Sequence, residues 1–506
     1  MFLCVPSVSL CVTKKKNLHR VPLRNHRATP RKNRNFLSKI IELKSGFAYL
    51  VIQMNLKMKK VLILGAGMVV KPMVEYLLEN HFRLTIASPM KPRADEIINS
   101  HPNGIAIDWS MDNPDTLERL VKEHDITVSL IPYKFHTDVA RICLKVKKSL
   151  VTTSYVQPEM QALDSDVKKS GLIFLNEIGL DPGIDHMSAM KIIDYIHGRG
   201  GNVEKFYSLC GALPAPEAAD NPLKYKFSWS PKGVILASRN SALYLKNGET
   251  VFIQPKDLFK DRFELPFPQI GLLEVYPNRD SISYINIYGI PEVKTIYRGT
   301  FRYKGWCETL DAMKSINMLD DSIKDYSGIS CAGFLSERAG LNISELRNKL
   351  ISKPGFSENS TALKSLEWLG FFSEKPMGYS KTTPFEITSD LMINKMLLAG
   401  DERDMVVLLH IFQASYPDGK TEVIKSSMLD FGTSETNTSI SRTVALPAAI
   451  ALKMILEGKI RLTGVHRPVI PEIYLPVLSE LEKMNIRMRE EYGLPPDEMI
   501  SQMTPP

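Results

Sequence analysis

The chain has 506 residues, of which 44% are hydrophobic and 24% charged, and this composition excludes a protein that is disordered throughout. A chain of this length normally divides into two or three domains. The net charge of +8 is concentrated at the start, because residues 1–53 hold eleven Lys and Arg and a single acid, Glu42. The remainder holds 53 basic and 55 acidic residues, so no nucleic-acid partner is indicated for it.

The N-terminal segment, residues 1–57, has two interpretations. It is basic, poor in acids and without apolar periodicity, so we expect a disordered tail. Such a composition is typical of a transit peptide, which would direct the protein to the mitochondrial matrix or a plastid. Alternatively the start codon is assigned too early, because Met54 and Met58 lie just before a clear strand, and the protein is then cytoplasmic.

The six cysteines are scattered and form no C-x-x-C pair, which argues against a metal site and against a disulfide framework. This usage is typical of a reducing compartment. No apolar run approaches the roughly 20 residues of a membrane helix, so no membrane partner is expected.

Short apolar runs alternate with amphipathic segments from Lys59 to about residue 180. One strand every ~20–30 residues, with helices between, predicts βαβ units and a doubly wound parallel sheet, hence an α/β fold. The expected strands are 61–64, 83–88, 105–108, 126–131, 150–154 and 172–176, and the expected helices include 114–123, 136–147 and 158–170.

The pattern changes after Arg199. We expect, in chain order, antiparallel strands over 199–305, helices over 310–400, a hairpin of strands 404–412 and 421–431 around Pro417-Asp418-Gly419, and an apolar helix 443–456 closed by Gly458.

A glycine loop, Gly65-Ala66-Gly67-Met68-Val69-Val70, follows the first strand and opens a helix. In a dinucleotide-binding loop the first glycine allows the tight turn, and the second lets the backbone approach the pyrophosphate. The third glycine is replaced by Val70. The position after the first strand of a βαβ series favours nucleotide binding over an ordinary two-glycine loop.

The end of the second strand indicates which nucleotide binds. An NAD site usually has an acid there, whereas this chain offers Ser88, Lys91 and Arg93 and no acid before Asp95. A hydroxyl and two cations suit a 2′-phosphate, so NADP is expected, with NAD possible. The alternative is a polar loop whose cations are simply solvated.

The stretch from Asn176 to His186 combines a turn signal with two acids behind the last strand of the series. Asp181 starts an Asp-Pro-Gly turn and also lies where ligands bind in open α/β sheets, at the carboxyl end of a parallel strand. Both roles are compatible. Asp185 is expected to cap the helix that follows.

Several long and unusual segments carry a family resemblance. They are I-P-Y-K-F-H (131–136), V-T-T-S-Y-V (151–156), N-E-I-G-L-D-P-G-I-D-H (176–186), L-P-A-P-E-A-A-D-N-P-L-K-Y-K-F-S-W-S (213–230), Y-P-N-R-D-S (276–281), R-G-T-F-R-Y (298–303) and E-R-D-M-V-V-L (402–408). Across residues 60 to about 475 the chain resembles the glutamate-forming saccharopine dehydrogenase family, also called saccharopine reductase.

The resemblance implies reversible oxidation of saccharopine with NADP, giving glutamate and 2-aminoadipate semialdehyde, and a homodimer. It also implies three domains after the tail. They are a Rossmann domain, 58–180 completed by 442–495; an α/β substrate-binding and dimerisation domain, 181–309 completed by 400–441; and a helical insertion, 310–399.

The family's binding residues fall on definite positions here. Its cofactor contacts fall on Gly65, Ala66, Gly67, Met68, Ser88, Pro89, Met90, Asp108, Trp109, Ile131, Thr153, Ser154, Leu180, Asp181, Pro182 and Trp229. Its substrate contacts fall on Ser154, Tyr155, Asp181, Arg279, Gly299, Thr300 and Phe301.

The chain departs from the family at three places. The family has Cys-Arg-Thr where Ser88-Pro89-Met90 stands, so Lys91 or Arg93 must replace the arginine that pairs with the 2′-phosphate. It has Thr where Lys134 stands and Gly where Lys224 stands.

Individual roles remain open within this frame. Arg279 suits a substrate carboxylate because its planar group binds in a bidentate way, although a local pair with Asp280 is the alternative. Asp181 and Tyr155 are the expected catalytic residues. His136 and His186 are expected to have structural roles rather than to act as the catalytic base. Cys210 is expected to line the site rather than to act as a nucleophile.

Two other functions are compatible with this fold. A carboxynorspermidine or homospermidine synthase shares the imine chemistry but acts on amines with fewer carboxylates. A non-catalytic NADP-binding regulator would not need Asp181, Tyr155 and Arg279, which are all present.

Overall fold

The computed structural model describes residues 58–433 and 437–499. The expectations for residues 1–57 therefore lie outside the described residues. The chain divides into two units, Met1–Met58 and Lys59–Pro506, and the fold below is that of the second.

Seven parallel strands form the first sheet, in the order β17-β6-β5-β4-β1-β2-β3. This is the 3-2-1-4-5-6 order of a dinucleotide-binding sheet, extended by one strand. Val61 and Ile63 pack into one core and Leu62 and Leu64 into another, so both faces are covered. The predicted Rossmann-type sheet is confirmed. Its strands are β1 (Lys60–Leu64), β2 (Arg83–Ser88), β3 (Gly104–Asp108), β4 (Ile126–Ser129), β5 (Ser149–Thr152), β6 (Ile173–Leu175) and β17 (Gly464–His466).

Helices cover the two faces of this sheet separately. Met73 of α2 and Ala94 of α3 belong to the core of one face, and Leu117 of α4 and Val139 of α5 to that of the other. The expected single helix 158–170 is instead two, because an i−3 bond from the Leu163 N–H to Met160 tightens the chain. The helices are α2 (Lys71–Glu79), α3 (Lys91–Ile98), α4 (Pro114–Glu123), α5 (His136–Lys145), α6 (Pro158–Gln161) and α7 (Asp164–Lys169).

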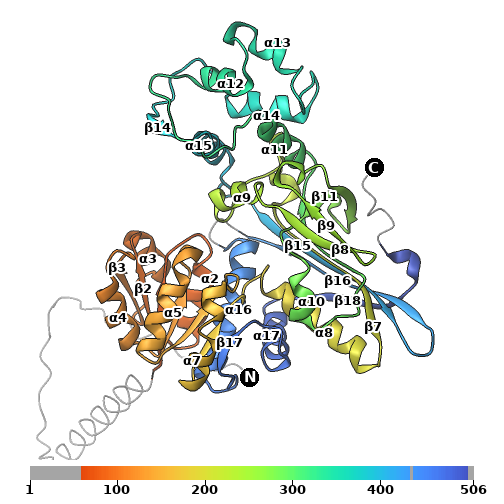
Figure 1. The fold of residues 1–506 in the computed structure, drawn as a ribbon. Helices are drawn as coiled ribbons and strands as arrows, with labels where there is room; N and C mark the ends of the chain where they lie inside the picture. Colours follow the sequence, from red (N-terminus) through yellow and green to blue (C-terminus); the bar gives the residue numbers. More distant parts are fainter. Residues whose placement is uncertain (1–57, 434–436, 500–506) are drawn as a thin grey trace, which may run out of the picture. The chain divides into compact units, whose positions relative to one another are not determined.

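The C-terminal segment returns to the first sheet. Helix α16 (Ser439–Leu456) packs on α2, α17 (Pro471–Lys483) packs on α8 (Ile184–Gly198), and β17 pairs with β6. Figure 1 shows these blue elements beside the orange ones. The assignment of 442–495 to this domain is wrong at its end, because β18 (Arg489–Leu494) pairs with β16 of the second sheet.

The second sheet is mixed and has nine strands, in the order β10-β11-β12-β7-β15-β16-β18 with β8 and β9 beside β12. Its pairs are antiparallel except β7 with β12. The expected hairpin is present, since β15 and β16 pair from Met405 opposite Phe431 to Ser415 opposite Thr421. The other strands and helices are β7 (Asn202–Pro214), β8 (Ala242–Lys246), β9 (Glu249–Ile253), β10 (Phe263–Phe267), β11 (Gly271–Pro277), β12 (Thr295–Arg302), β15 (Asp404–Ser415), β16 (Thr421–Phe431), α9 (Pro231–Ala237) and α10 (Ser283–Tyr288).

The segment between β12 and β15 is mainly helical, as predicted, with one two-stranded sheet of β13 and β14. Ser360 and Thr383 cap α14 and α15 by accepting the N–H of the third residue on. The elements are α11 (Trp306–Ser315), β13 (Lys324–Asp325), α12 (Cys331–Ala339), α13 (Leu346–Leu350), α14 (Thr361–Leu369), β14 (Lys381–Thr382) and α15 (Pro384–Met396).

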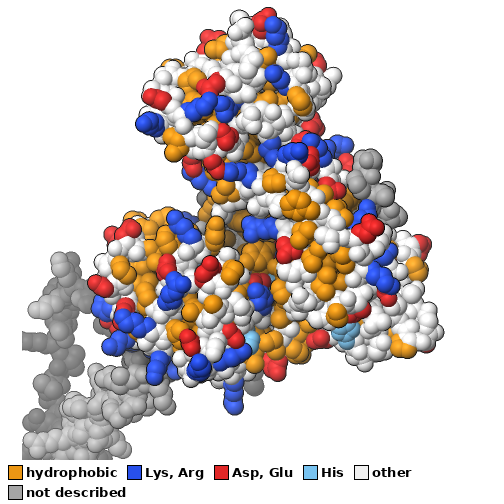
Figure 2. All heavy atoms as spheres, viewed as in Figure 1, with side chains coloured by type: hydrophobic (Ala, Val, Ile, Leu, Met, Phe, Trp, Pro, Cys, Tyr) orange, Lys and Arg blue, Asp and Glu red, His pale blue; other side chains and the backbone are white. Residues whose placement is uncertain are grey.

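Helix α16 is apolar because it is a core helix. Among the described residues it alone has the length and hydropathy to cross a membrane, and 72% of the stretch is buried inside the protein. At the surface, Figure 2 shows acidic and basic side chains interspersed over the visible face, in keeping with the balanced charge of the sequence after residue 53.

We expect Lys224→Gly to stabilise the protein. Lys224 is exposed and has a φ of +48°, a left-handed conformation that costs a residue with a Cβ about 1–2 kcal/mol. The gain in unfolding free energy is therefore about 0.5–1 kcal/mol, measured by urea denaturation, after the greater chain entropy of glycine. Lys224→Ala is the matched control and keeps the Cβ. An equal gain in Lys224→Ala would contradict this explanation.

Candidate active site

The two glycines of the loop between β1 and α2 differ in their surroundings: Gly65 is required by the backbone conformation and close packing, whereas the space beside Gly67 is open. Gly65 has a φ of +106°, and a Cβ there would lie 3.0 Å from the Leu130 carbonyl oxygen. A Cβ at Gly67 would meet nothing within 4 Å. Packing therefore does not explain Gly67, whereas close approach of a ligand does.

The start of α2 has the features of a phosphate site. Its first turn contains no acid, and its Ncap side chain, Val70, accepts no hydrogen bond. The N–H groups of Ala66, Gly67 and Met68 donate to no acceptor in the described part of the chain. Free N–H groups at a positive helix terminus suit a pyrophosphate, so these residues fit NADP.

The end of β2 presents the two predicted cations. The buried Ser88 hydroxyl accepts the Met90 N–H at 3.1 Å, while Pro89 and Met90 are exposed. Lys91 and Arg93 begin α3 and pair with Asp95 and Glu96 at 2.6 and 3.1 Å. Exposed pairs of this kind contribute only about 0.5 kcal/mol, so both cations can turn to a phosphate.

The other predicted cofactor residues, apart from Trp229 just before α9, lie at or after the carboxyl ends of parallel strands, but two have side chains that are already used. The Trp109 indole N–H donates to the Asn113 carbonyl at 3.1 Å, and Leu180 packs in the core. These two can contact a cofactor only through the backbone. The rest are exposed or part-buried, apart from the buried Pro182: Asp108, Ile131, Thr153, Ser154 and Trp229.

Tyr155, Asp181 and Arg298 meet at the end of β5 and β6. The Tyr155 hydroxyl donates to Asp181 Oδ1 at 3.0 Å, and Arg298 Nη2 donates to the same oxygen and, at 3.3 Å, to the Tyr155 hydroxyl. Two predicted catalytic residues are thus in contact. Arg298 was not predicted.

Asp181 has one carboxylate oxygen held and one free. Oδ2 accepts no hydrogen bond from any described residue, and the side chain is 16% exposed. Burial raises the pKa of Asp181, as does the nearby charge of Asp185, while Arg298 opposes the rise. The site therefore contains a carboxylate with an open oxygen and a strengthened affinity for a proton.

The prediction that Asp185 caps α8 is wrong. The Ncap residue is Gly183, and Asp185 lies within the first turn. Its Oδ1 accepts the Gly183 N–H at 2.6 Å and its Oδ2 accepts from Arg298 at 3.2 Å. Asp185 is fully buried because it neutralises Arg298.

His186 belongs to a second buried network and is not a free base. Its Nε2 bonds to Glu177 at 2.9 Å and its Nδ1 to the Tyr288 hydroxyl at 2.7 Å. Although burial lowers the pKa of His186, Asp185 and Glu177 raise it on balance. Arg467 pairs with the other oxygen of Glu177 at 2.9 Å, so the network is neutralised internally.

His136 lies beneath the predicted substrate residue Ser154. Its Nε2 bonds to the Ser154 hydroxyl at 2.9 Å and its Nδ1 to the Ser129 hydroxyl at 2.8 Å. Burial lowers the pKa of His136 to about 4, so the ring is neutral at pH 7. It orients Ser154 and is not exposed to a ligand.

Cys210 lies on β7 and faces the same region. Burial raises the pKa of its thiol well above the usual range, and the carboxylates of Asp181 and Asp185 add to this. A thiol that stays protonated is a poor nucleophile, as the sequence led us to expect.

Arg279 is exposed and has a φ of +53°, a conformation rare for a side chain of its size. Its guanidinium lies 5.4 Å from the Tyr155 ring centroid. Asp280 does not pair with it and instead accepts the N–H groups of Ile282 and Ser283. Arg279 is thus near Tyr155 and forms no ion pair with any described acid.

The Gly299-Thr300-Phe301 stretch lies in β12. Phe301 is fully buried in the core of the second sheet, and a Cβ at Gly299 would lie 2.7 Å from Val275 and Tyr297. These two residues can contact a substrate only through the backbone, whereas Thr300 is part-buried.

Lys134 and Lys224, where the chain departs from the family, are both exposed. No group of three metal-ligating side chains occurs in 58–433 or 437–499.

Two family models together match most of the chain. A family model for the saccharopine dehydrogenase NADP binding domain matches residues 61–175, and one for the saccharopine dehydrogenase C-terminal domain matches residues 179–486. The match to an NADP binding domain confirms the predicted cofactor.

Curated relatives and a solved structure are similar over most of the chain. Saccharopine dehydrogenases [NADP(+), L-glutamate-forming] of Schizosaccharomyces pombe and Saccharomyces cerevisiae are each 37% identical over 86% of this chain and 99% of theirs. Mitochondrial alpha-aminoadipic semialdehyde synthase of Bos taurus is 34% identical over 85% of this chain and 47% of its own length. The apo saccharopine dehydrogenase (L-Glu forming) structure from Saccharomyces cerevisiae has a TM-score of 0.79 and 35% identity, covering 86% and 99%.

The neutral His136 makes stability depend on pH. Its folded pKa of about 4 lies below the unfolded value of 6.5, so the unfolded chain takes up a proton first as the pH falls. We expect about 3 kcal/mol of unfolding free energy to be lost between pH 6.5 and 4. His136→Gln, which cannot titrate, should lack this part of the loss in urea denaturation at several pH values. Parallel pH curves for the two proteins would refute it.

Proposed function

Since the chain belongs to the saccharopine dehydrogenase family, we propose that it catalyses the reversible oxidation of saccharopine with NADP and water to L-glutamate, 2-aminoadipate 6-semialdehyde and NADPH. One proton is released with the reduced cofactor. The observation that carries the proposal is the contact of Tyr155, Asp181 and Arg298 at the carboxyl edge of the first sheet.

The cofactor is held by the glycine loop and the start of α3. The free N–H groups of Ala66, Gly67 and Met68 bind the pyrophosphate, and Lys91 and Arg93 bind the 2′-phosphate. NADP supplies the hydride acceptor. Ser88, which holds the Met90 N–H, shapes the turn between the two groups.

Asp181 removes the proton from the secondary amine. Saccharopine carries a protonated amine at neutral pH, and a hydride leaves the neighbouring carbon only after this proton is lost. Asp181 Oδ2 is open and its pKa is raised by burial, which favours acceptance of a proton. Arg298 and Tyr155 hold Oδ1 and so fix the orientation of Oδ2.

Tyr155 and Arg279 position the substrate around this carboxylate. Arg279 has no acidic partner among the described residues and lies over the Tyr155 ring, so it binds the carboxylate beside the amine. Ser154, oriented by neutral His136, offers a further hydroxyl. We propose that the other predicted substrate contacts, Gly299, Thr300 and Phe301, border the same substrate.

We also propose that the protein is a cytoplasmic homodimer, or a mitochondrial one if the basic leader is used. Phe252 and Leu272, on strands near one edge of the second sheet, are 59% and 54% exposed and offer an apolar contact surface. Light scattering on the purified chain should give about twice 57.1 kDa. A mass of 57.1 kDa would refute the dimer.

The test of the function is saccharopine-dependent reduction of NADP, with NAD in parallel, followed at the absorbance of the reduced nicotinamide. Turnover with NADP is expected. Turnover only with carboxynorspermidine or homospermidine would support the polyamine alternative. Binding of NADPH without turnover of any of these amines would support a regulator.

We predict that Asp181→Asn lowers kcat by about 10²–10⁴-fold, because the proton acceptor is lost. In the wild-type enzyme kcat/KM falls as the pH drops through the raised pKa of Asp181, and this acid limb should disappear in the variant. Tyr155→Phe removes one hydrogen bond to the same carboxylate and should cost about tenfold while keeping the limb. An Asp181→Asn enzyme with an unchanged acid limb would exclude the role.

The cofactor assignment predicts a change of preference. Lys91→Ala with Arg93→Ala should lower kcat/KM for NADP by about 10–100-fold, since charged hydrogen bonds to the 2′-phosphate are lost. The value for NAD, which lacks this phosphate, should be unchanged and serves as the internal control. An equal loss with both cofactors would show that the two residues do not contact the 2′-phosphate.

A further inference from the structure

Strand β12 presents two arginines on one face. Side chains alternate along a strand, so Arg298, Thr300 and Arg302 share a face, and Gly299 and Phe301 point to the other. Arg298 is neutralised by two carboxylates. Arg302 lies four residues further, about 13 Å along the strand.

Arg302 is a buried cation without an anion. It is only 4% exposed, and its one hydrogen bond runs from Nη1 to the carbonyl oxygen of Phe301 at 2.8 Å. Its Nε is buried and has no partner, and it forms no ion pair with any described acid. A buried charge without a partner is costly, so its retention needs a reason.

The side chains around Arg302 also lack partners. Its guanidinium lies 5.0 Å from the Tyr225 ring centroid, 5.5 Å from that of Trp306 and 6.0 Å from that of Tyr276. The Tyr225 hydroxyl and the Trp306 indole N–H are both buried and unsatisfied. The indole N–H of Trp229 is also buried and lies next to the Tyr225 hydroxyl. We call Arg302, Tyr225, Trp229, Tyr276 and Trp306 the Arg302 cluster.

Two structural explanations account for only part of this cluster. Glu274 lies opposite Arg302 in the strand register, but its Oε1 pairs with Arg262 Nε at 3.1 Å, and its buried Oε2 accepts no hydrogen bond from Arg302 or any other described residue. The aromatic rings stabilise the guanidinium by cation–π contact, yet that leaves the Tyr225 hydroxyl and the Trp306 indole N–H unsatisfied. Together with the Arg302 Nε–H these are three donors that lack an acceptor, which is what a carboxylate needs.

We propose that the Arg302 cluster binds a substrate carboxylate that is remote from the reacting C–N bond. The inference rests on the proposed function, in which Arg279 holds the carboxylate beside the amine. Saccharopine has two further carboxylates, one ending its glutaryl arm and one on its lysine carbon, and either has the required chemistry. Thr300, opposite Cys210 of β7, separates Arg302 from Arg298 on this face of β12, so the cluster lies four residues along the strand from the guanidinium that holds Asp181.

The test compares wild type and Arg302→Met on three amines. They are saccharopine, N6-(1-carboxybutyl)-lysine without the terminal glutaryl carboxylate, and N-(1,3-dicarboxypropyl)-cadaverine without the lysine carboxylate. Arg302→Met should lower kcat/KM for saccharopine by about 10²-fold, mainly through KM. For one of the analogues the two enzymes should be equal, which identifies the bound carboxylate. No loss on saccharopine, or the same loss on all three amines, would overturn the proposal.

Isosteric variants separate binding from structure. Tyr225→Phe removes an unsatisfied buried donor and keeps the ring, so the ligand-free protein should be as stable as wild type or more stable, while KM for saccharopine rises about tenfold. Lower stability with an unchanged KM would assign the cluster a structural role and overturn the proposal. Glu274→Gln is the matched control and should leave KM unchanged. If the KM of Glu274→Gln were as high as that of Arg302→Met, Arg302 would instead act by neutralising Glu274, and the proposal would be overturned.

Failure of the proposed function is distinguishable from failure of this inference. If the wild-type enzyme does not turn over saccharopine, the function is wrong, and glutarate then serves as the probe. A rise in the thermal midpoint of wild type with glutarate that is absent in Arg302→Met would still support a carboxylate site. No rise, or the same rise in both proteins, would overturn it.

Discussion

The structure depends on one buried cation that joins the two sheets. Arg298, on a strand of the second sheet, is 3% exposed and contacts Asp181 and Asp185, which follow a strand of the first. Taking these charges out of water is costly, and removing one partner from such a group costs about 3–5 kcal/mol because the others stay buried. Asp181, the proposed proton acceptor, is therefore also a structural group, and its position is tied to that of β12.

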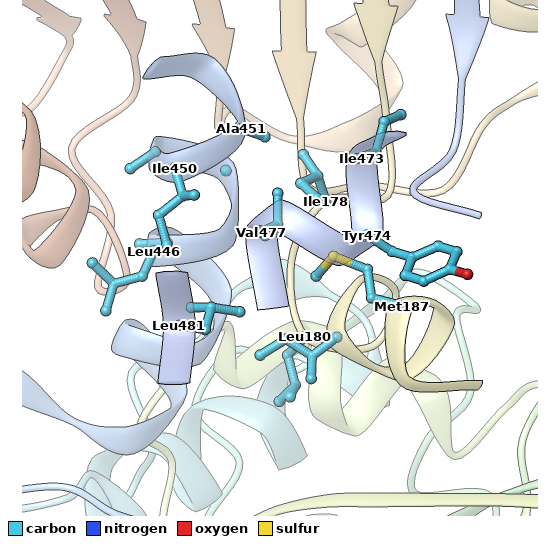
Figure 3. Close-up of a cluster of buried hydrophobic side chains, with 14 of the residues drawn as sticks. Ile178, Leu180, Met187, Leu446, Ile450, Ala451, Ile473, Tyr474, Val477 and Leu481 are labelled. Atoms are coloured by element: carbon cyan, nitrogen blue, oxygen red, sulfur yellow. The ribbon is translucent and has the colours of Figure 1, made fainter. Parts of the chain in front are cut away.

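The loop that carries Asp181 is fixed by packing on its other side. Figure 3 shows Ile178 and Leu180 directed into a cluster with side chains of α8, α16 and α17, such as Met187 and Val477. A fully buried apolar side chain of this size contributes about 1.5–3 kcal/mol. Alternate residues of the loop therefore face the core and the charged group, and the C-terminal helices hold the site although they contribute none of the predicted ligands.

Sequence reasoning reached the residues that follow parallel strands and missed those that depend on tertiary contacts. Gly67 and Asp181 were predicted from their positions, because the carboxyl ends of parallel strands meet at one edge, whereas Tyr155 was implied by the family resemblance. Arg298 is 117 residues from Asp181, and its side chain direction follows only from the register of β12 with β7. The alternation in R-G-T-F-R-Y was the available signal. Asp185 was assigned to a helix cap because local rules describe one helix and not the guanidinium packed on it.

The arginines near the site differ in whether an acidic side chain pairs with them, and the proposed binding of an acidic substrate depends on this difference. Arg298 is consumed by two internal carboxylates and offers no net attraction to an anion. Arg279 and Arg302 form no ion pair with a described acid, one exposed beside Tyr155 and the other buried among aromatic rings. In the function proposed above, these two free cations orient the substrate by its carboxylates and leave its amine at Asp181 Oδ2.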